Sequence, residues 1–274
     1  MESHLNRIAH FCDFFSEYAD NYLIIGGSAC SVWYSDAEPH FRGTNDMDVV
    51  LILELLNQSF LDRFKLYLQQ ESYQSWEKHV LDESTQKVMY RFSSTDSHGP
   101  TCIELLSRKG DLLHLESDAH LSPLTHDGEY TGLSCILVHE AYYDFLRSQA
   151  SSKHNCSLVS IPGLIMLKIK AYLNLHEAKR RGIHARGSDG SSRNINKHRN
   201  DIFFMLTDLR AARGARISLP EQLRTDLTTF MNHYPPHSEE WSNVFQNLRV
   251  RYGRSFPEEM EPTDLLEQLT SLFI

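Results

Sequence analysis

The chain has 274 residues, of which 41% are hydrophobic and 23% charged, and its formal charge at pH 7 is −9. These proportions are typical of globular proteins and exclude a disordered or fibrous chain, while the negative charge argues against a general nucleic-acid coat protein. No apolar run approaches the roughly 18 residues of a membrane-spanning helix, and the first residues show no secretory signal pattern. We therefore expect a cytoplasmic protein without a membrane partner.

The cysteines and histidines give little support for a structural metal site. The five cysteines are dispersed and form no CxxC pair, so we expect reduced thiols rather than a disulfide framework. The 15 histidines include no HExxH motif, and nearly all of them are expected to be surface or hydrogen-bonded side chains.

Hydrophobic periodicity predicts a mixed α/β first half. The expected elements, in chain order, are an amphipathic helix within 2–19, a short buried strand at 22–25, a tight Gly-Gly turn, a helix beginning at Ser28, a strand at 47–53, a helix within 57–70, strands at 87–94 and 101–108, and a strand that passes into a helix over 133–147. These elements favour a small, largely antiparallel sheet flanked by helices.

After about residue 158 the pattern becomes helical, which predicts two domains, 1–157 and 158–274. The expected helices lie at 161–181, at 198–212, at 239–252 and at 264–273, and Pro162 is in the first turn of the first of them. Ser218 and Glu221 form a capping-box pattern, which predicts the start of another helix there. The glycine- and serine-rich stretch 182–192 is expected to be a flexible loop within the helical half.

The segment RGTNDMDVVLIL begins at Arg42 and places Asp46 and Asp48 at the mouth of an apolar strand. Side chains two residues apart on a strand point to the same face, so the two carboxylates converge. Their repulsion would raise one pKa unless a cation lay between them, and Mg²⁺ binds carboxylates and substrate phosphates together. The alternative is that Asp46 caps a turn while Asp48 pairs with Arg42.

The segment YLIIGGSACSVWY places Gly26, Gly27 and Ser28 between a strand and a helix. Glycines allow close backbone approach, and the N–H groups at a helix start bind anions, so this turn is a candidate phosphate cradle. Its spacing excludes a GxGxxG loop, a Walker A loop and a GxSxG nucleophile elbow. An ordinary strand-to-helix turn is the alternative.

Two further features carry charge. Glu104 interrupts the apolar strand TCIELLSR, where it is either a third metal ligand that helps to deprotonate an attacking hydroxyl or a solvent-facing edge residue. Residues 178–199 contain seven Lys or Arg and one Asp, a local charge of +6. Such a segment either recruits a phosphate-bearing ligand or is simply a solvated loop.

The order and spacing of GGS, RGTNDMD and the later IEL strand resemble the nucleotidyltransferase superfamily with the DNA polymerase β-like fold, over about residues 20–110. The second half resembles the AbiEii-type abortive-infection nucleotidyltransferase toxins through PGLIMLKIKAYLN and KHRNDIFFML. In these segments Lys168 and Asp201 take the places of the family's basic and acidic residues. The chain departs from the pattern at Glu104, where aspartate is more usual, and at KHRNDI, which has a single acid.

The resemblance implies a nucleotidyltransferase catalytic domain that moves a nucleoside monophosphate from an NTP to an acceptor hydroxyl and releases pyrophosphate. It assigns catalysis and binding of Mg²⁺, or of Mn²⁺ in its place, to Asp46, Asp48 and Glu104. It assigns contacts with the triphosphate to Gly26, Gly27, Ser28, Arg42 and Lys168. An ion pair between Lys168 and Asp201 that organises the helical half is an equal alternative.

The resemblance also implies a toxin that modifies RNA, with tRNA as an example, recruited through 178–199 and partnered by a separate antitoxin. Two alternatives remain open. The chain is either a catalytically silent nucleotide- or partner-binding module on the same fold, or a transferase whose acceptor is a small molecule or a protein.

Overall fold

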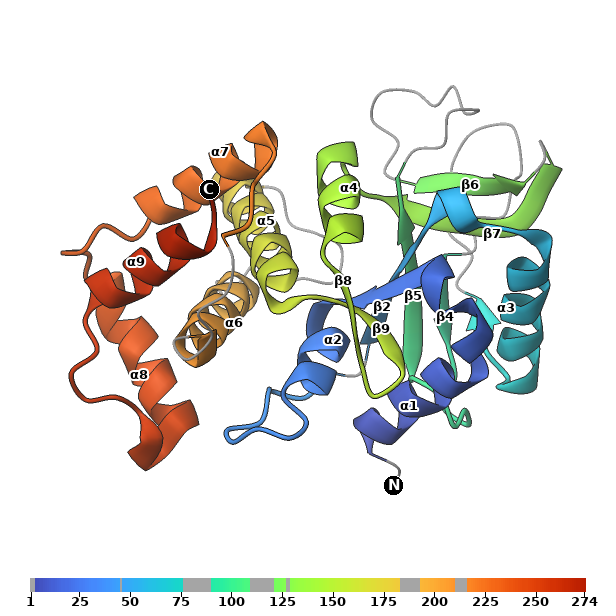
Figure 1. The fold of residues 1–274 in the computed structure, drawn as a ribbon, viewed down its shortest axis with the longest axis horizontal. Helices are drawn as coiled ribbons and strands as arrows, with labels where there is room; N and C mark the ends of the chain where they lie inside the picture. Colours follow the sequence, from blue (N-terminus) through green and yellow to red (C-terminus); the bar gives the residue numbers. More distant parts are fainter. Residues whose placement is uncertain are drawn as a thin grey trace. The chain divides into compact units, whose positions relative to one another are not determined.

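The computed structural model describes residues 3–44, 46–75, 90–108, 121–126, 129–182, 193–209 and 216–274. The chain divides into two compact units, 1–160 and 161–274 (Figure 1). Residues 183–192, which include most of the predicted flexible loop and part of the basic segment 178–199, lie outside the described residues.

The first unit is built on one mixed sheet, with the strand order β3-β4-β5-β2-β1-β9-β8 (Figure 1). The strands are β1 Tyr22–Ile25, β2 Asp46–Leu51, β3 Gln74–Ser75, β4 Arg91–Ser93, β5 Cys102–Ser107, β8 Ala150–Lys153 and β9 Cys156–Val159. The strands β6 Leu121–His126 and β7 Glu129–Leu137 pair with each other, and β7 also pairs with β5. The neighbours β1/β9, β2/β5 and β5/β7 are parallel, and the other pairs are antiparallel. The predicted mixed α/β fold is confirmed.

Helices accompany this sheet, and three of them begin with a side-chain cap, from Ser3, Asn57 and His139. They are α1 His4–Phe14, α2 Gly26–Trp33, α3 Gln58–Gln70 and α4 Glu140–Ser148, with a 3₁₀ segment at Ser16–Asn21. Ser3 accepts a hydrogen bond from the Asn6 N–H at the start of α1, and Asn57 accepts one from the Phe60 N–H at the start of α3. Each cap satisfies a backbone donor that the helix itself leaves unpaired.

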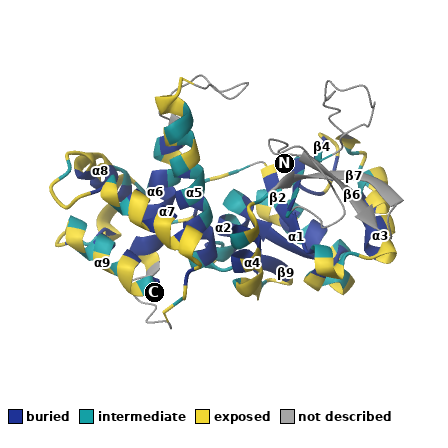
Figure 2. Cartoon of the chain, turned by 90° about the horizontal axis from the view of Figure 1, so that it is seen from above, coloured by how far each residue is buried: buried dark blue, intermediate teal, exposed yellow. Residues whose placement is uncertain are grey.

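The core of the first unit is rich in aromatic rings from α1 and α3 and the strand beside them. Fully buried members are Phe11, Phe15, Tyr22, Phe60, Phe64 and Tyr67. The ring centres of Phe15 and Tyr67 are 5.3 Å apart, and those of Phe11 and Tyr22 are 5.4 Å apart, both in edge-to-face geometry. Burying each such side chain stabilises the fold by about 1.5–3 kcal/mol. Figure 2 shows buried residues, in dark blue, on α1 and β9.

Two local predictions are wrong. The helix α2 begins at Gly26 with Ile25 as its N-cap, so the two glycines form its first turn rather than a turn that precedes a helix at Ser28. Ser218 and Glu221 form no capping box, because α7 begins at Glu221 with Pro220 as its N-cap and no side-chain cap bond. The capping box lies instead at the last helix, where Glu261 and Asp264 bond reciprocally.

The expectation of reduced thiols is wrong for one pair of cysteines. Cys12 on α1 and Cys156 on β9 form a disulfide, whereas Cys30 and Cys102 are buried thiols. The partners are 144 residues apart in the sequence. Only the packing of α1 against β9 brings them together, so no local spacing could have indicated the bond.

The second unit is helical, with α5 Ile161–Arg180, α6 Arg193–Leu209, α7 Glu221–Asn232, α8 Glu240–Tyr252 and α9 Pro262–Leu272. Its core combines Phe203 of α6, Phe230 of α7 and the rings of Tyr234 and Trp241, all buried. The end of the chain is tied back to the segment before α7, because the Ile274 N–H donates to the Ile217 carbonyl at 2.9 Å. No described helix of either unit is long and apolar enough to cross a membrane.

Candidate active site

Three carboxylates of the first unit share one face of the sheet. The strand β2 runs parallel to β5 in a register that sets Asp46 opposite Cys102 and Asp48 opposite Glu104. Because side chains alternate along a strand and paired residues point to the same face, Asp46, Asp48 and Glu104 all project from one side. The sequence placed the two aspartates on one face, and the register adds the glutamate beside them.

An arginine that the sequence analysis missed lies among these carboxylates. Arg91 of β4 pairs in register with Glu104, and its Nη1 lies 2.7 Å from Glu104 Oε1. Its Nη2 lies 4.0 Å from Asp46 Oδ1. The available signal was the pair of strands predicted at 87–94 and 101–108, since antiparallel pairing across a short turn places Arg91 near Glu104.

The carboxylates differ in exposure. The Asp46 side chain is 54% exposed and the Glu104 side chain 21%, while Asp48 is half-buried. Burial raises the pKa of Glu104, with a further increase from Asp46, and the nearby Arg91 only partly offsets that rise. Burial also raises the pKa of the neighbouring Cys102 thiol to about 11, so this cysteine stays protonated near neutral pH and is a poor nucleophile.

The first turn of α2 is in direct contact with this site. Gly26 has a positive φ of 66°, and a Cβ at this position would overlap the Asp48 carboxylate. A Cβ on Gly27 would lie 3.0 Å from the Thr44 Cβ. Both glycines therefore permit a close approach that a side chain would block, as the sequence indicated, although they do so within the helix.

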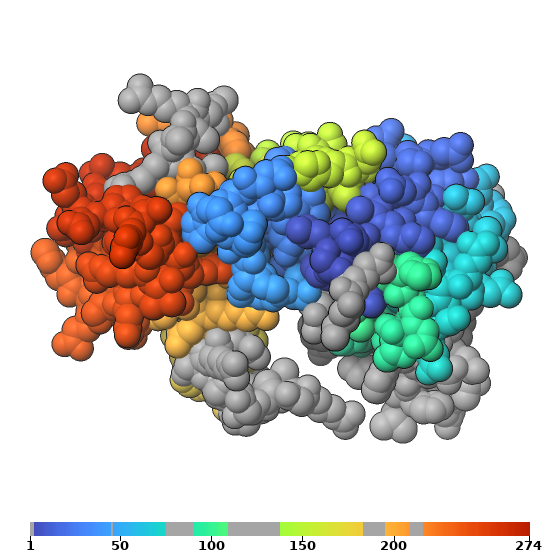
Figure 3. All heavy atoms as spheres, turned by 90° about the horizontal axis from the view of Figure 1, so that it is seen from below, coloured from blue at the N-terminus to red at the C-terminus, as the bar shows by residue number. Residues whose placement is uncertain are grey.

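Ser28 anchors the backbone that carries Asp46. Its side chain is fully buried, and its Oγ donates to the Asp46 carbonyl at 2.8 Å. The Nε2 of His4 on α1 lies 3.1 Å from the same hydroxyl, and Figure 3 shows α1, in dark blue, against the segment that carries α2. The hydroxyl thus holds β2 in place, where the sequence analysis expected it to hold a phosphate.

His4 is a second residue near the site that the sequence analysis missed. Burial, and then the nearby Arg7, lower the pKa of His4, against an opposing effect of Asp46. The ring is therefore neutral near pH 7. A histidine near the start of α1 has no sequence signal that links it to Asp46, since the contact exists only because α1 packs against α2.

The two predicted phosphate-binding cations lie in different surroundings. Arg42 is half-buried, and its guanidinium carbon is 5.4 Å from the centre of the Phe41 ring. Lys168 belongs to the second unit and is 5% exposed. Its Nζ lies 2.9 Å from Asp201 Oδ2, and Arg251 Nη1 lies 3.8 Å from Asp201 Oδ1. The ion pair between Lys168 and Asp201 that was one of two expectations is therefore present.

Asp46 and Asp48 are suitable donors for a hard divalent cation, but the described residues contain no group of three His, Cys, Asp or Glu side chains arranged to hold a metal. Glu104 is engaged by Arg91 instead. Mg²⁺ is commonly held by one or two carboxylates together with water and substrate phosphates. The aspartate pair fits an ion whose remaining ligands come from the substrate and water. It does not fit an ion whose ligands all come from the protein.

No family model, curated protein or solved structure matches the chain. The assignment of a function therefore depends on the motifs and on the geometry of the site.

Proposed function

We propose that the chain is a Mg²⁺-dependent nucleotidyltransferase that moves a nucleoside monophosphate from an NTP to an acceptor hydroxyl and releases pyrophosphate. The observation that carries the proposal is the register of β2 and β5, which sets Asp48 opposite Glu104 with Asp46 on the same face. The first turn of α2, with Gly26 against Asp48, lies beside these carboxylates. Phosphoryl transfer uses carboxylates that bind a metal ion and backbone N–H groups that bind the phosphates. The site places the two side by side.

Each residue has a task in this proposal. Asp46 and Asp48 would hold the ion. The bound ion would neutralise negative charge on the phosphoryl group being transferred and on the pyrophosphate that leaves. The backbone N–H groups at the start of α2 bind the triphosphate, because Gly26 and Gly27 allow close approach and the helix dipole favours anions there. Ser28 positions Asp46 through its backbone carbonyl.

Arg91 and Glu104 form a charged pair at the edge of the site. We propose that Arg91, whose side chain is 42% exposed, turns from Glu104 to a phosphate oxygen when the NTP binds. Released from the ion pair, Glu104 then accepts the proton of the attacking hydroxyl. The pKa of Glu104 lies above its ordinary value because of burial, which suits a general base.

Calorimetry tests the binding half of the proposal. A non-hydrolysable NTP analogue is titrated into wild type and into the double variant Asp46→Asn/Asp48→Asn, with and without Mg²⁺. We expect binding that requires Mg²⁺ in wild type and is lost in the variant. The control Asp62→Asn/Asp96→Asn neutralises the same number of aspartates in the same unit, both of them exposed, and leaves binding unchanged. Equal binding by all three proteins contradicts the metal site.

A second candidate is a catalytically silent binding module on the same fold. The ion pair between Arg91 and Glu104 favours it, because it engages the third carboxylate. This module would bind the analogue with Mg²⁺ in the titration above and yet transfer no label from an NTP. Binding together with transfer excludes it.

The acceptor and the biological setting belong to the proposal as well. We propose an RNA acceptor such as tRNA, recruited through the basic segment 178–199, in a cytoplasmic toxin whose antitoxin is a separate chain. Lys179, Arg180 and Arg199 are described members of that segment. A small molecule or a protein is the alternative acceptor. The size of the labelled product distinguishes RNA, protein and small-molecule acceptors.

A further inference from the structure

The helical unit contains a cavity of about 630 Å³ between α5, α6 and the connection from α7 to α8. Its volume is within the range of about 300–1,000 Å³ that small-ligand sites occupy. Its lining includes Tyr172, Lys179, Arg180, Arg199, His233 and Glu240. All of them belong to the second unit, so the cavity is independent of the carboxylates of the first unit.

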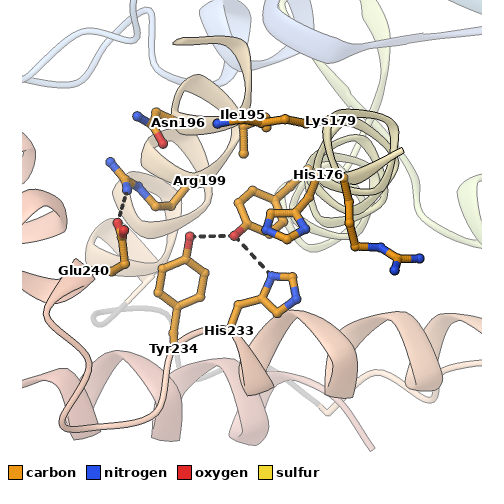
Figure 4. Close-up of a pocket in the computed structure, with 10 residues that line it drawn as sticks. His176, Lys179, Ile195, Asn196, Arg199, His233, Tyr234 and Glu240 are labelled. Carbon is orange, nitrogen blue, oxygen red and sulfur yellow. Dashed lines mark hydrogen bonds and ion pairs between the residues drawn. The ribbon is translucent and has the colours of Figure 1, made fainter. Parts of the chain in front are cut away.

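The cavity has a buried floor and a basic rim. Tyr172, Tyr234 and Arg199 are buried, whereas Lys179 and Arg180 at the end of α5 are exposed. Three cations and one carboxylate, Glu240, line this space, and Arg180 also pairs with Glu177 of its own helix, with Arg180 Nε 2.7 Å from Glu177 Oε2. Figure 4 shows the Lys179 side chain reaching from α5 toward Ile195 and Asn196 of α6, above the open centre. A positive potential over a polar floor favours an anion.

Arg199 is held in place by two contacts. Its Nη1 lies 2.9 Å from Glu240 Oε2, and its Nε donates to Asn200 Oδ1 at 3.0 Å. Figure 4 shows the guanidinium directed at Glu240 at one side of the cavity. Because Glu240 is 54% exposed and Arg199 only 5%, an entering anion can take the place of the flexible carboxylate while the arginine stays fixed.

A hydrogen-bond chain fixes the aromatic floor. The Tyr234 hydroxyl donates to the Tyr172 oxygen at 3.0 Å, and Nδ1 of His233 is within hydrogen-bond distance of the same oxygen, at 3.2 Å. The rings of His233 and His176 are 4.6 Å apart. A floor of fixed polar rings needs no reorganisation when a ligand enters, which lowers the cost of binding.

We propose that this cavity binds a phosphate group, held by Lys179, Arg180 and Arg199 over the Tyr172, Tyr234 and His233 floor. A phosphate matches the site because its several oxygens accept charge-assisted hydrogen bonds from donors on different helices at once. Arginine is also well suited to phosphate oxygens, since its planar fork can donate two parallel bonds. The cavity is larger than a phosphate alone, so the group can arrive as a free ion or as part of a nucleic-acid chain.

Histidine ring NMR on the full chain tests this site. Inorganic phosphate is titrated at constant ionic strength, and the Cε1–H signals of His176 and His233 are followed, assigned with the variants His176→Gln and His233→Gln. We expect saturable shifts in wild type and binding weaker by about tenfold or more in Lys179→Gln/Arg180→Gln, because the variant removes two charged donors to the anion. The variant removes two exposed side chains, so it is expected to fold.

A matched variant and a second ligand complete the experiment. Arg216→Gln/Arg254→Gln removes two exposed charges of the same unit outside the cavity and is expected to bind as wild type does. The second ligand is an RNA dinucleotide with a 5′-phosphate. If it binds more tightly than both inorganic phosphate and the unphosphorylated dinucleotide, the phosphate belongs to a nucleic acid. If it binds with the same affinity as inorganic phosphate, the ligand is the free ion. Shifts that are not saturable, or that weaken equally in both double variants, overturn the proposal. Asp48→Asn, which tests the proposed transferase, is expected to leave these shifts unchanged.

Discussion

Gly26 and Asp48 are in such close contact that a methyl group added to Gly26 would overlap the Asp48 Oδ2 atom. Gly26 also has a φ of 66°, a conformation that costs other residues about 1–2 kcal/mol. Gly26→Ala is therefore expected to lower the free energy of unfolding by about that amount and to displace Asp48, with a large loss of transferase activity. Denaturant unfolding and an NTP transfer assay measure the two effects.

The control for this prediction is Gly43→Ala, because a Cβ at Gly43 would meet no atom within 4 Å. This variant is expected to keep both stability and activity. If Gly26→Ala and Gly43→Ala behaved alike, the contact between α2 and Asp48 would have no functional importance.

Ser28→Ala distinguishes a positioning hydroxyl from a phosphate ligand. The substitution removes the donor to the Asp46 carbonyl and leaves buried polar groups without that bond, which costs about 1–3 kcal/mol. We expect lower stability and a lower kcat with little change in KM for the NTP. A raised KM at unchanged stability would restore the phosphate-binding role. Ser31→Ala, which removes a bond to the Gly27 carbonyl within the same helix, is the control.

Glu104 predicts a pH dependence of stability. Its native pKa lies above its ordinary value of 4.5 because of burial, so the native state binds this proton more tightly than the unfolded state does. The contribution to stability is present below the unfolded pKa and is lost as the pH rises through the native pKa. Denaturant unfolding across this pH range measures the effect. As the pH rises, the free energy of unfolding should fall less in Glu104→Gln than in wild type, because glutamine does not titrate.

Arg91→Gln tests the cause of this dependence. Arg91 lowers the pKa of Glu104, so its removal should raise that pKa further and extend the loss of stability to higher pH. An unchanged profile in Arg91→Gln would mean that the ion pair does not control the ionisation of Glu104.

The ion pair of Lys168 and Asp201 predicts a large stability effect in the helical unit. Both side chains are nearly inaccessible, at 6% and 1% exposure. Lys168→Met leaves the buried Asp201 carboxylate with the more distant Arg251, at 3.8 Å, and is therefore expected to cost about 3 kcal/mol, the lower end for a broken buried pair. The double variant Lys168→Met/Asp201→Leu should cost less than the sum of the single variants.

Lys170→Met is the matched control for that prediction. Lys170 pairs with Asp226 at the same distance of 2.9 Å, but its side chain is 31% exposed. Solvent screening limits the contribution of such a pair to about 1 kcal/mol or less. Equal costs for the two lysines would show that burial of Lys168 does not determine its contribution.

The sequence predicted much of the fold because the elements carry local signals. The strand at Tyr22–Ile25 matches its predicted bounds, and α3 begins after Asn57, where a capping residue precedes an amphipathic run. The start of α2 was misplaced because Gly-Gly usually indicates a turn, whereas here the close approach to Asp48 requires glycine inside the helix. Local propensity carries no information about such a tertiary constraint.

The candidate site was predicted only in part. Asp46 and Asp48 were found because they are two residues apart on one strand, which fixes their common face. Arg91, His4 and the disulfide between Cys12 and Cys156 were missed, because each depends on register or packing between segments distant in sequence. Long-range pairing of this kind is set by the fold as a whole and leaves no short motif.

The most direct test of the proposed function is transfer of label from each α-³²P-labelled ribonucleoside triphosphate, with Mg²⁺, to total cellular RNA and to protein. Wild type, Asp46→Asn/Asp48→Asn and the control Asp62→Asn/Asp96→Asn are compared. We expect a labelled RNA band with wild type and the control, and a yield lower by about a hundredfold or more in the Asp46/Asp48 variant, since metal stabilisation contributes several kcal/mol. A band of equal intensity in all three proteins would contradict the assignment of Asp46 and Asp48 as the catalytic metal ligands.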